Sequence, residues 1–224
     1  MGILYVVATP IGNLEDITLR ALKILEEVDL ILCEDTRVTR KLLDHYGLKK
    51  STLAYHQHTT PGQVNQLISL ILGNRSTALV TDAGTPGLSD PGGSLIKAAI
   101  KSGVEVMPVP GPSALTAAIS VAGWAMDKFL FLGFLPHKKG RQMLIKKITE
   151  SEYPVVLFES VHRIDKLLNE LSQLHSAREI LVGRELTKKF ETVYRGAVEA
   201  VKNQLTFSET KGEFVVIISP TNYK

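Results

Sequence analysis

The sequence predicts an α/β protein with two α/β domains, a mostly parallel sheet in the first and a mixed sheet in the second. Short apolar runs alternate with segments of helical period, which is typical of such folds. After Gly123 the chain becomes richer in aromatic strand-like runs and basic stretches, which indicates a second domain. Apolar residues make up 44% of the 224 residues and charged residues 22%, so a disordered or collagen-like chain is excluded.

The first domain is expected to span residues 1–115. Within it, Leu19, Leu22 and Leu25 recur at helical spacing and predict one apolar helix face, and Gly47 is placed to end the following helix. We expect strands at residues 3–8, 30–33, 77–81 and 104–109, and helices at residues 18–27, 37–46, 61–72, 93–101 and 113–121.

The second domain is expected to span residues 116–224. A basic helical stretch is expected to begin at Pro136, and Phe129, Phe131 and Phe134 are expected in the core because they lie within a strand-like run. We expect strands at residues 129–134, 155–159, 180–185, 192–195 and 214–219, and helices at residues 162–174 and 197–205.

Cysteine and charge content limit the classes of protein. The single cysteine, Cys33, cannot form an internal disulfide and ends an apolar run, which favours a packed strand residue. The pattern of Cys and His predicts no metal site. The formal charge of +3 divides into −1 up to Pro112 and +4 beyond it. The apolar N-terminus reads as a strand rather than a signal peptide, and no run reaches membrane-spanning length, so we expect a cytoplasmic protein.

Three loops rich in Gly and Pro follow directly after expected strands, at residues 8–13, 81–87 and 109–114. Ligands of open α/β sheets bind beyond the carboxyl ends of the strands, so three such loops could form one site. Asp82 could accept hydrogen bonds from ribose hydroxyls or an amino group, and the helix opening at Ser113 could hold a carboxylate or phosphate. Ordinary turns are the alternative interpretation. Neither a GxGxxG nor a GxxxxGK[ST] motif is present.

Taken together, these segments resemble the tetrapyrrole-methylase-like family of S-adenosylmethionine-dependent methyltransferases. The resemblance lies in residues 8–18, 34–37, 81–87, 89–92, 108–114, 159–163, 183–188 and 212–216. It implies S-adenosylmethionine as cofactor, held in a cleft between two α/β domains, and a homodimer. The residues that it assigns to the cofactor are Pro10, Asp82, Ala83, Gly84, Leu88, Ser113 and Ala114, with a weaker contribution from the turn at Gly212 and Glu213.

One branch of that family fits best. Residues 8–13 read Ala-Thr-Pro-Ile-Gly-Asn, where tetrapyrrole enzymes usually carry Gly-x-Gly-Pro-Gly-Asp. Together with residues 34–37 and 55–58, this departure resembles enzymes that methylate a ribose 2′-hydroxyl of a cytidine in the decoding region of bacterial 16S rRNA. The implied partner is the small-subunit rRNA or the assembled small subunit. A relative acting on a small molecule such as a tetrapyrrole, and a non-catalytic RNA-binding relative, are the alternatives.

A general base would assist attack by a 2′-hydroxyl. The candidates are Glu34, Asp35, His56, His58, Glu159 and Glu185. Each has another interpretation: Glu34 and Asp35 could belong to a helix cap, the histidines could be surface residues, and Glu159 with Arg163 or Glu185 with Arg184 could form structural ion pairs. The sequence does not choose among them, and a reaction without a dedicated base stays open.

The basic segment 136–141, continued by Lys146 and Lys147, is either a solvated helix face or a contact for RNA phosphates. On the second interpretation, Lys138, Lys139 and Arg141 bind RNA.

Overall fold

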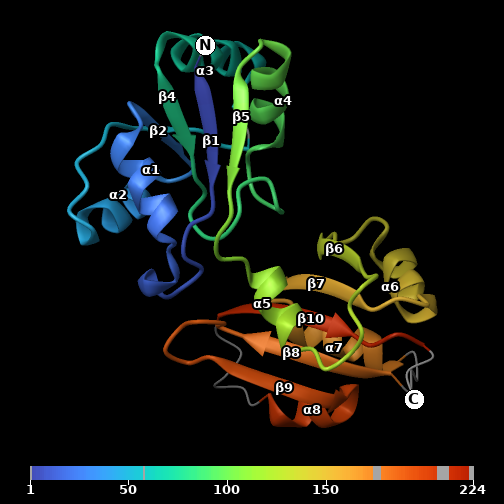
Figure 1. Ribbon diagram of the computed structural model, residues 1–224. Coiled ribbons are helices and arrows are strands. Elements are labelled where there is room, and N and C mark those ends of the chain that lie inside the picture. The colour runs from blue at the N-terminus through green and yellow to red at the C-terminus, as the bar shows by residue number, and fades with distance from the viewer. Residues whose placement is uncertain (1, 58, 174–177, 206–211, 222–224) are drawn as a thin grey trace. The chain divides into compact units, whose positions relative to one another are not determined.

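The computed structural model describes residues 2–57, 59–173, 178–205 and 212–221. The chain divides into two compact units, Met1–Ser113 and Ala114–Lys224, called unit 1 and unit 2 below. Each unit is built around its own five-stranded sheet (Figure 1).

Unit 1 contains a parallel sheet with the strand order β3-β2-β4-β1-β5. Its strands are β1 (Ile3–Val7), β2 (Leu30–Cys33), β3 (Thr52–Ala54), β4 (Ser76–Leu79) and β5 (Glu105–Val109). Its helices are the 3-10 turn η1 (Leu14–Asp16), α1 (Leu19–Glu27), α2 (Thr36–His45), α3 (Pro61–Gly73) and α4 (Gly93–Lys101). Because every strand runs in the same direction, the loops after them leave from one edge of the sheet.

Apolar side chains cover both faces of the unit 1 sheet. Helices α1 and α2 lie on one face and α3 and α4 on the other (Figure 1). Val7 and Ile31 pack with α1 and α2, whereas Leu4 and Leu79 pack with α3 and α4. Burial on both faces explains why these strands read as continuous apolar runs rather than alternating ones.

Two details of unit 1 differ from expectation. Helix α1 buries Ala21, Ile24 and Leu25, whereas Leu19 at its first position is 85% exposed. The prediction that Leu19, Leu22 and Leu25 form one apolar face was therefore wrong at the N-terminal end of the helix, where Thr18 caps the helix beside solvent. Strand β3 was not expected, because this three-residue edge strand carries no run of buried apolar residues.

Unit 2 contains a mixed sheet with the strand order β6-β7-β10-β8-β9, in which only the β6–β7 pair is parallel among the described strands. Its strands are β6 (Leu130–Phe134), β7 (Val155–Ser160), β8 (Glu179–Arg184), β9 (Thr192–Ala197) and β10 (Glu213–Ile218). Its helices are α5 (Ala114–Ser120), α6 (Arg141–Glu150), α7 (Ile164–Gln173) and α8 (Val198–Gln204). The unit 2 core lies between one face of this sheet and helices α6, α7 and α8.

The aromatic residues of β6 correct a second expectation. Phe134 is 53% exposed and Phe129 and Phe131 are half-buried, so the three side chains are not core residues. Strand β6 lies at the edge of the sheet, and its register shifts between Phe131 and Gly133. Phe131 and Phe134 make edge-on contacts with Phe158 of the neighbouring strand.

The helix in the basic stretch of unit 2 begins later than expected. Helix α6 starts at Arg141, five residues after Pro136, because Gly140 adopts a left-handed conformation with φ +81°. Residues 136–140 are therefore a loop, and Lys138 and Lys139 lie on that loop rather than on a helix face. In the described part of the chain, no helix is long and apolar enough to cross a membrane.

Candidate functional site

The loops after β1 and β4 of unit 1 are joined to each other. Thr9 and Gly84 form an isolated antiparallel bridge, in which each backbone N–H donates to the other residue's carbonyl oxygen at 2.9 and 3.0 Å. The Thr9 hydroxyl also donates to the Thr81 carbonyl at 3.1 Å. Two of the three loops expected to form a ligand site therefore lie together.

The third loop joins the same group. The Thr85 hydroxyl donates to the Pro112 carbonyl at 3.3 Å, which connects the β4 loop to the β5 loop. A Cβ atom added to Gly111 would lie 3.1 Å from the Ala8 Cβ, so the β5 loop also packs closely against the end of β1. All three loops therefore meet at the carboxyl edge of the sheet.

Gly84 shapes this edge rather than offering free backbone groups to a ligand. Its φ of +76° lies in the left-handed region, and an added Cβ would lie 3.3 Å from the Ile11 side chain. Its N–H and carbonyl are both bonded to Thr9. The neighbouring residues Asp82 and Ala83 are exposed, so they are better placed to contact a ligand.

A fourth segment, at the end of β2, meets the same edge. The Asp35 N–H donates to Asp82 Oδ1 at 2.9 Å, and the Glu34 carboxyl is close enough to Asp82 to be affected by its charge and by its backbone N–H. These contacts join the segments that follow the adjacent strands β2 and β4. Glu34, Asp35 and Asp82 therefore form one acidic cluster beside the loops.

The members of this cluster have different proton affinities. Hydrogen bonds from the side chain and backbone N–H of Arg37 lower the pKa of Asp35 to about 2. Burial, followed by the charge of Asp82, raises the pKa of Glu34 above its ordinary value. Burial also raises the pKa of the Cys33 thiol, in keeping with its expected role as a packed residue.

Asp35 also caps helix α2 through a 2.8 Å bond from the Arg37 N–H, as one interpretation of the sequence held. His56 is exposed and its charge acts on the Glu34 carboxylate, so it belongs to the surroundings of the cluster. His58 lies outside the described residues.

The remaining residues that the family resemblance assigns to the cofactor differ in their burial and in the unit to which they belong. Pro10 is buried, and Leu88 is half-buried with its N–H bonded to the Thr85 carbonyl. Ser113 is the last residue of unit 1, whereas Ala114 is the first residue of α5 and of unit 2.

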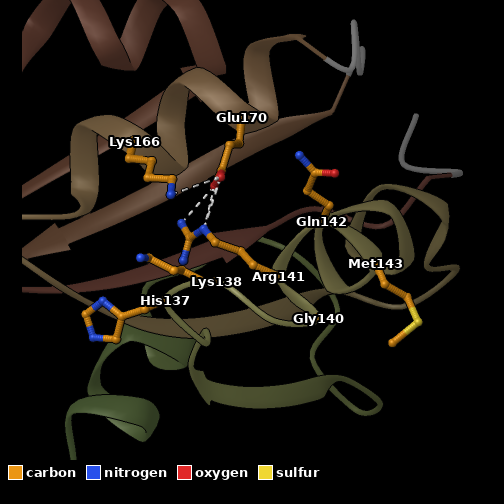
Figure 2. Close-up of a pocket in the computed structure, with 8 residues that line it drawn as sticks. All are labelled: His137, Lys138, Gly140, Arg141, Gln142, Met143, Lys166 and Glu170. Carbon is orange, nitrogen blue, oxygen red and sulfur yellow. Dashed lines mark hydrogen bonds and ion pairs between the residues drawn. The ribbon is translucent and has the colours of Figure 1, made fainter.

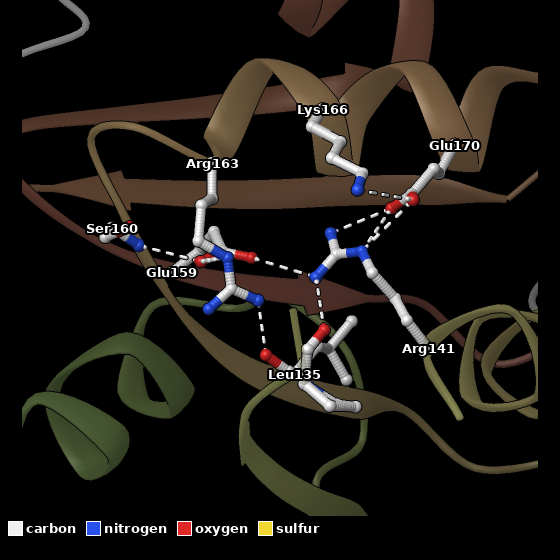
Figure 3. Close-up of polar contacts among 8 residues, drawn as sticks. Leu135, Arg141, Glu159, Ser160, Arg163, Lys166 and Glu170 are labelled. Atoms are coloured by element: carbon white, nitrogen blue, oxygen red, sulfur yellow. Dashed lines mark hydrogen bonds and ion pairs between the residues drawn. The ribbon is translucent and has the colours of Figure 1, made fainter. Parts of the chain in front are cut away.

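In unit 2, charged side chains form a buried network (Figure 3). Glu159 of β7 has a fully buried side chain and lies between two guanidinium groups, 3.3 Å from Arg163 Nε and 3.7 Å from Arg141 Nη1. Arg141 also bonds to Glu170 of α7 at 2.8 Å. The Glu159–Arg163 ion pair is confirmed.

This network corrects two sequence hypotheses. Glu159 is held between arginines and out of solvent, so it is not placed to act as a base on a substrate. The Arg141 side chain is 3% exposed and its guanidinium is engaged by carboxylates, so it is not a free phosphate contact. Sequence spacing could not reveal this, because Glu159 and Glu170 are 18 and 29 residues from Arg141.

The Glu185 motif forms a second polar cluster in unit 2. Lys188 Nζ lies 2.9 Å from Glu185 and 2.8 Å from Glu213, and the Glu213 N–H donates to Glu185 at 2.9 Å. Burial alone would raise the pKa of Glu185, but the bonds from Lys188 and Glu213 lower it overall. A carboxylate held in this way is a poor base, and Lys188 forms an ion pair with it.

Backbone strain accompanies this second cluster. Glu185 and Thr187 both have positive φ, +50° and +66°. A Cβ at Gly212 would lie 2.5 Å from the Glu185 side chain, so only glycine fits there. Strained residues held by their surroundings are often found at ligand sites.

A pocket of about 440 Å³ opens beside the buried network (Figure 2). It is lined by His137, Lys138, Gly140, Arg141, Gln142, Met143, Lys166 and Glu170. Lys166 and Glu170 were not among the sequence candidates, because a Lys–Glu pair four residues apart is an ordinary feature of helix surfaces. Within the described residues, no group of three or more His, Cys, Asp or Glu side chains could hold a metal ion.

The fold is that of two-domain α/β methyltransferases. Uroporphyrin-III C-methyltransferase from Thermus thermophilus, solved in complex with S-adenosylhomocysteine, matches with a TM-score of 0.68 and 20% identity over 98% of both chains. The sequence model of the Tetrapyrrole (Corrin/Porphyrin) Methylases matches residues 3–202. The chain therefore belongs to the tetrapyrrole methylase family.

Curated relatives resemble the chain over nearly its whole length. It is 45% identical to the Ribosomal RNA small subunit methyltransferase I of Mesorhizobium japonicum, across 99% of this chain and 76% of the relative. It is 42% identical to the protein of the same name from Thermotoga maritima, across 98% of this chain and 99% of the relative.

Proposed function

We propose that the protein transfers a methyl group from S-adenosylmethionine to the ribose 2′-hydroxyl of a cytidine in the decoding region of bacterial 16S rRNA. The observation that carries this proposal is the 42–45% identity, over nearly the whole chain, to relatives named as rRNA methyltransferases. The uroporphyrin enzyme shares the fold at only 20% identity, so its substrate gives no support to a tetrapyrrole as substrate here.

The carboxyl edge of unit 1 fits the cofactor. Asp82 is exposed at the end of β4, and a carboxylate that accepts one bond from Asp35 has lone pairs left for ribose hydroxyls. Ala83 beside it is exposed and small, so the ligand can approach closely. The bonds between Thr9 and Gly84 and the bond from Thr85 to Pro112 fix the loops before binding, which lowers the entropy cost of holding a ligand.

When bound, S-adenosylmethionine supplies an electrophilic methyl group carried on a positively charged sulfur. The ribose oxygen loses its proton as it forms a bond to that carbon, while the bond from carbon to sulfur breaks. Among the acidic candidates, Glu34 suits proton transfer best, because its carboxylate holds a proton more readily than Asp35 does. In this proposal Asp35 positions the end of β2, through its bonds to Asp82 and Arg37.

The pH profile separates these two roles. Glu34→Gln is expected to lower kcat about 10²-fold or more and to remove the fall of kcat toward low pH. That fall should begin at a higher pH than for an ordinary glutamate, because the pKa of Glu34 is raised. Asp35→Asn is the control, and it should keep the wild-type profile. An unchanged profile in Glu34→Gln would remove Glu34 from the reaction.

The function is tested with purified protein, S-adenosylmethionine carrying a labelled methyl group, and small ribosomal subunits from a strain lacking the gene. The expected product is one labelled 2′-O-methylcytidine in the decoding region, located by mass spectrometry of nuclease fragments. Naked 16S rRNA, tested in parallel, shows which form is the substrate. Label on a tetrapyrrole, or no S-adenosylmethionine binding by calorimetry, would overturn the proposal in favour of the small-molecule or the non-catalytic alternative.

Two further features belong to this proposal. An enzyme acting on ribosomal RNA works in the cytoplasm, where its substrate is made. The homodimer implied by the family resemblance is tested by light scattering of the purified protein, with twice the mass of 24.6 kDa as the expected result.

A further inference from the structure

The pocket beside the buried network joins two segments distant in sequence. One wall is the loop before α6, with His137, Lys138 and Gly140, and the other is Lys166 of α7. Figure 2 shows the nitrogen-bearing ends of Lys138, Arg141 and Lys166 turned toward the same side of the pocket, whereas Met143 points away from it. The pocket is therefore lined by positive charge from more than one element.

The acidic groups near this pocket are already neutralised. Glu170 accepts from Arg141 and lies 4.0 Å from Lys166, and Glu159 lies between Arg141 and Arg163. Lys138 and Lys139 are exposed and form no ion pair within the described part of the chain. The surface consequently has positive charge available for an anion from outside.

The buried network also fixes the loop that carries these lysines. Arg163 donates to the Leu135 carbonyl (Figure 3). Arg141 Nη1 donates to the Pro136 carbonyl at 3.4 Å. The other end of the loop is closed by a 3.2 Å bond from the Arg141 N–H to the Lys138 carbonyl. Lys138 is thus presented from an ordered turn, which reduces the ordering cost of binding.

We propose that this surface, formed by Lys138, Lys139 and Lys166, binds backbone phosphates of the RNA substrate. The inference rests on the proposed function, because that function supplies the RNA. Lys138 and Lys166 hold one phosphate at the pocket, and Lys139 contacts a neighbouring phosphate. Arg141 is a positioning residue beneath them. Phosphate contacts orient RNA without reading its sequence, so this surface serves to place the substrate rather than to select the cytidine.

The test uses a fluorescently labelled fragment of small-subunit rRNA that spans the decoding region. Its Kd is measured between 50 and 200 mM salt, and the salt slope is the slope of the logarithm of the binding constant against the logarithm of the salt concentration. Each phosphate contact is expected to contribute about 0.7–0.9 to this slope. Lys138→Ala with Lys166→Ala should weaken binding about tenfold and flatten the slope by about 1. Lys139→Ala added to that pair should flatten it further.

The matched control is Lys146→Ala with Lys147→Ala, which removes the same charge from exposed positions of α6 outside the pocket lining. This pair should leave the slope close to wild type. Equal slopes for the pocket and control variants would overturn the proposal, whether RNA binds elsewhere or a protein of the ribosome occupies this surface. Circular dichroism and unchanged S-adenosylmethionine affinity verify that each variant is folded.

Failure of this inference is distinguishable from failure of the proposed function. If the pocket variants bind RNA as the wild type does while methyl transfer proceeds, only the phosphate surface is wrong. If the wild-type protein transfers no methyl group to subunits or to rRNA, the proposed function is wrong, and the salt slopes of the variants still show whether Lys138 and Lys166 contact RNA.

Discussion

Acidic residues lie beside arginines in both units, yet the two settings give them opposite roles. In unit 1, Asp35 pairs with Arg37, whose side chain is 86% exposed. In unit 2, Glu159 pairs with Arg163 and Arg141, and its own side chain is fully buried. The exposed pair lies at the end of a strand beside the proposed cofactor site, whereas the buried carboxylate helps to hold a loop in place.

Burial explains the difference. An exposed ion pair gains little because water screens it and solvates each charge separately. A buried charge has lost its water, so each partner depends on the others for compensation. Reactive carboxylates are accordingly expected at the edge of unit 1, and structural carboxylates beneath the basic surface of unit 2.

The largest expected effect is the loss of Glu159. Glu159→Ala leaves Arg141 and Arg163 buried without that carboxylate, which should lower the free energy of unfolding by about 3–5 kcal/mol. Thermal melting measures it. Asp35→Ala is the comparison in the exposed pair and should shift the melting temperature far less. Similar losses from both variants would contradict the distinction between the two settings.

The next effect concerns the shape of the unit 1 edge. Gly84→Val places a branched side chain at φ +76° and against Ile11, so it should cost at least about 1–2 kcal/mol of stability and strongly weaken S-adenosylmethionine binding. Calorimetry and melting measure the two changes.

Gly103→Val is the matched control for Gly84→Val. Gly103 has φ +77°, but an added Cβ meets nothing within 4 Å, and it follows α4 rather than lining the site loops. It should be destabilised by a similar backbone strain while retaining cofactor affinity. Equal loss of affinity in both variants would show that strain alone, and not the site loop, weakens binding.

A smaller effect is expected from Lys188→Met in unit 2. Without this amine, Glu185 and Glu213 lose their shared partner, so stability at neutral pH should fall by about 1 kcal/mol. The pKa of Glu185 should also rise, because the Lys188 bond helps to lower it. Carboxyl NMR titration and urea unfolding measure both. An unchanged Glu185 titration would show that the Glu213 N–H alone controls this group.

The smallest effect is the titration of Asp35 in unit 1. Its pKa of about 2 should appear directly in NMR, and Arg37→Ala should move it toward the ordinary value of 3.8. Because the folded-state pKa is depressed, the contribution of Asp35 to stability is present above about pH 4 and is lost as the pH falls toward 2. A midpoint near 3.8 in the wild-type protein would contradict the Arg37 pairing.

Most of the fold could be predicted from the sequence because its signals are local. Buried parallel strands such as residues 30–33 are short apolar runs, and Gly47 ends α2 in the expected left-handed conformation. Strand β3 and the exposed Phe134 could not be predicted, because both depend on lying at a sheet edge, which only the strand order determines.

The candidate site also has some features that the sequence could predict and others that it could not. The three Gly/Pro loops could be expected to meet, because parallel strands place their carboxyl ends at one edge. The burial of Arg141 could not be expected, since it follows the basic run at residues 137–139 and its acidic partners come from β7 and α7. The same packing brings Lys166 to the pocket beside Arg141.

The proposal that unit 1 binds S-adenosylmethionine and that unit 2 binds RNA phosphates is tested most directly by measuring both affinities in the same variants. Asp82→Ala should lose S-adenosylmethionine affinity and keep the RNA salt slope, whereas Lys138→Ala with Lys166→Ala should do the reverse. Asp82→Asn keeps an oxygen acceptor for the Asp35 N–H and reports the effect of charge alone. Wild-type S-adenosylmethionine affinity in Asp82→Ala would contradict the placement of the cofactor at the strand ends of unit 1.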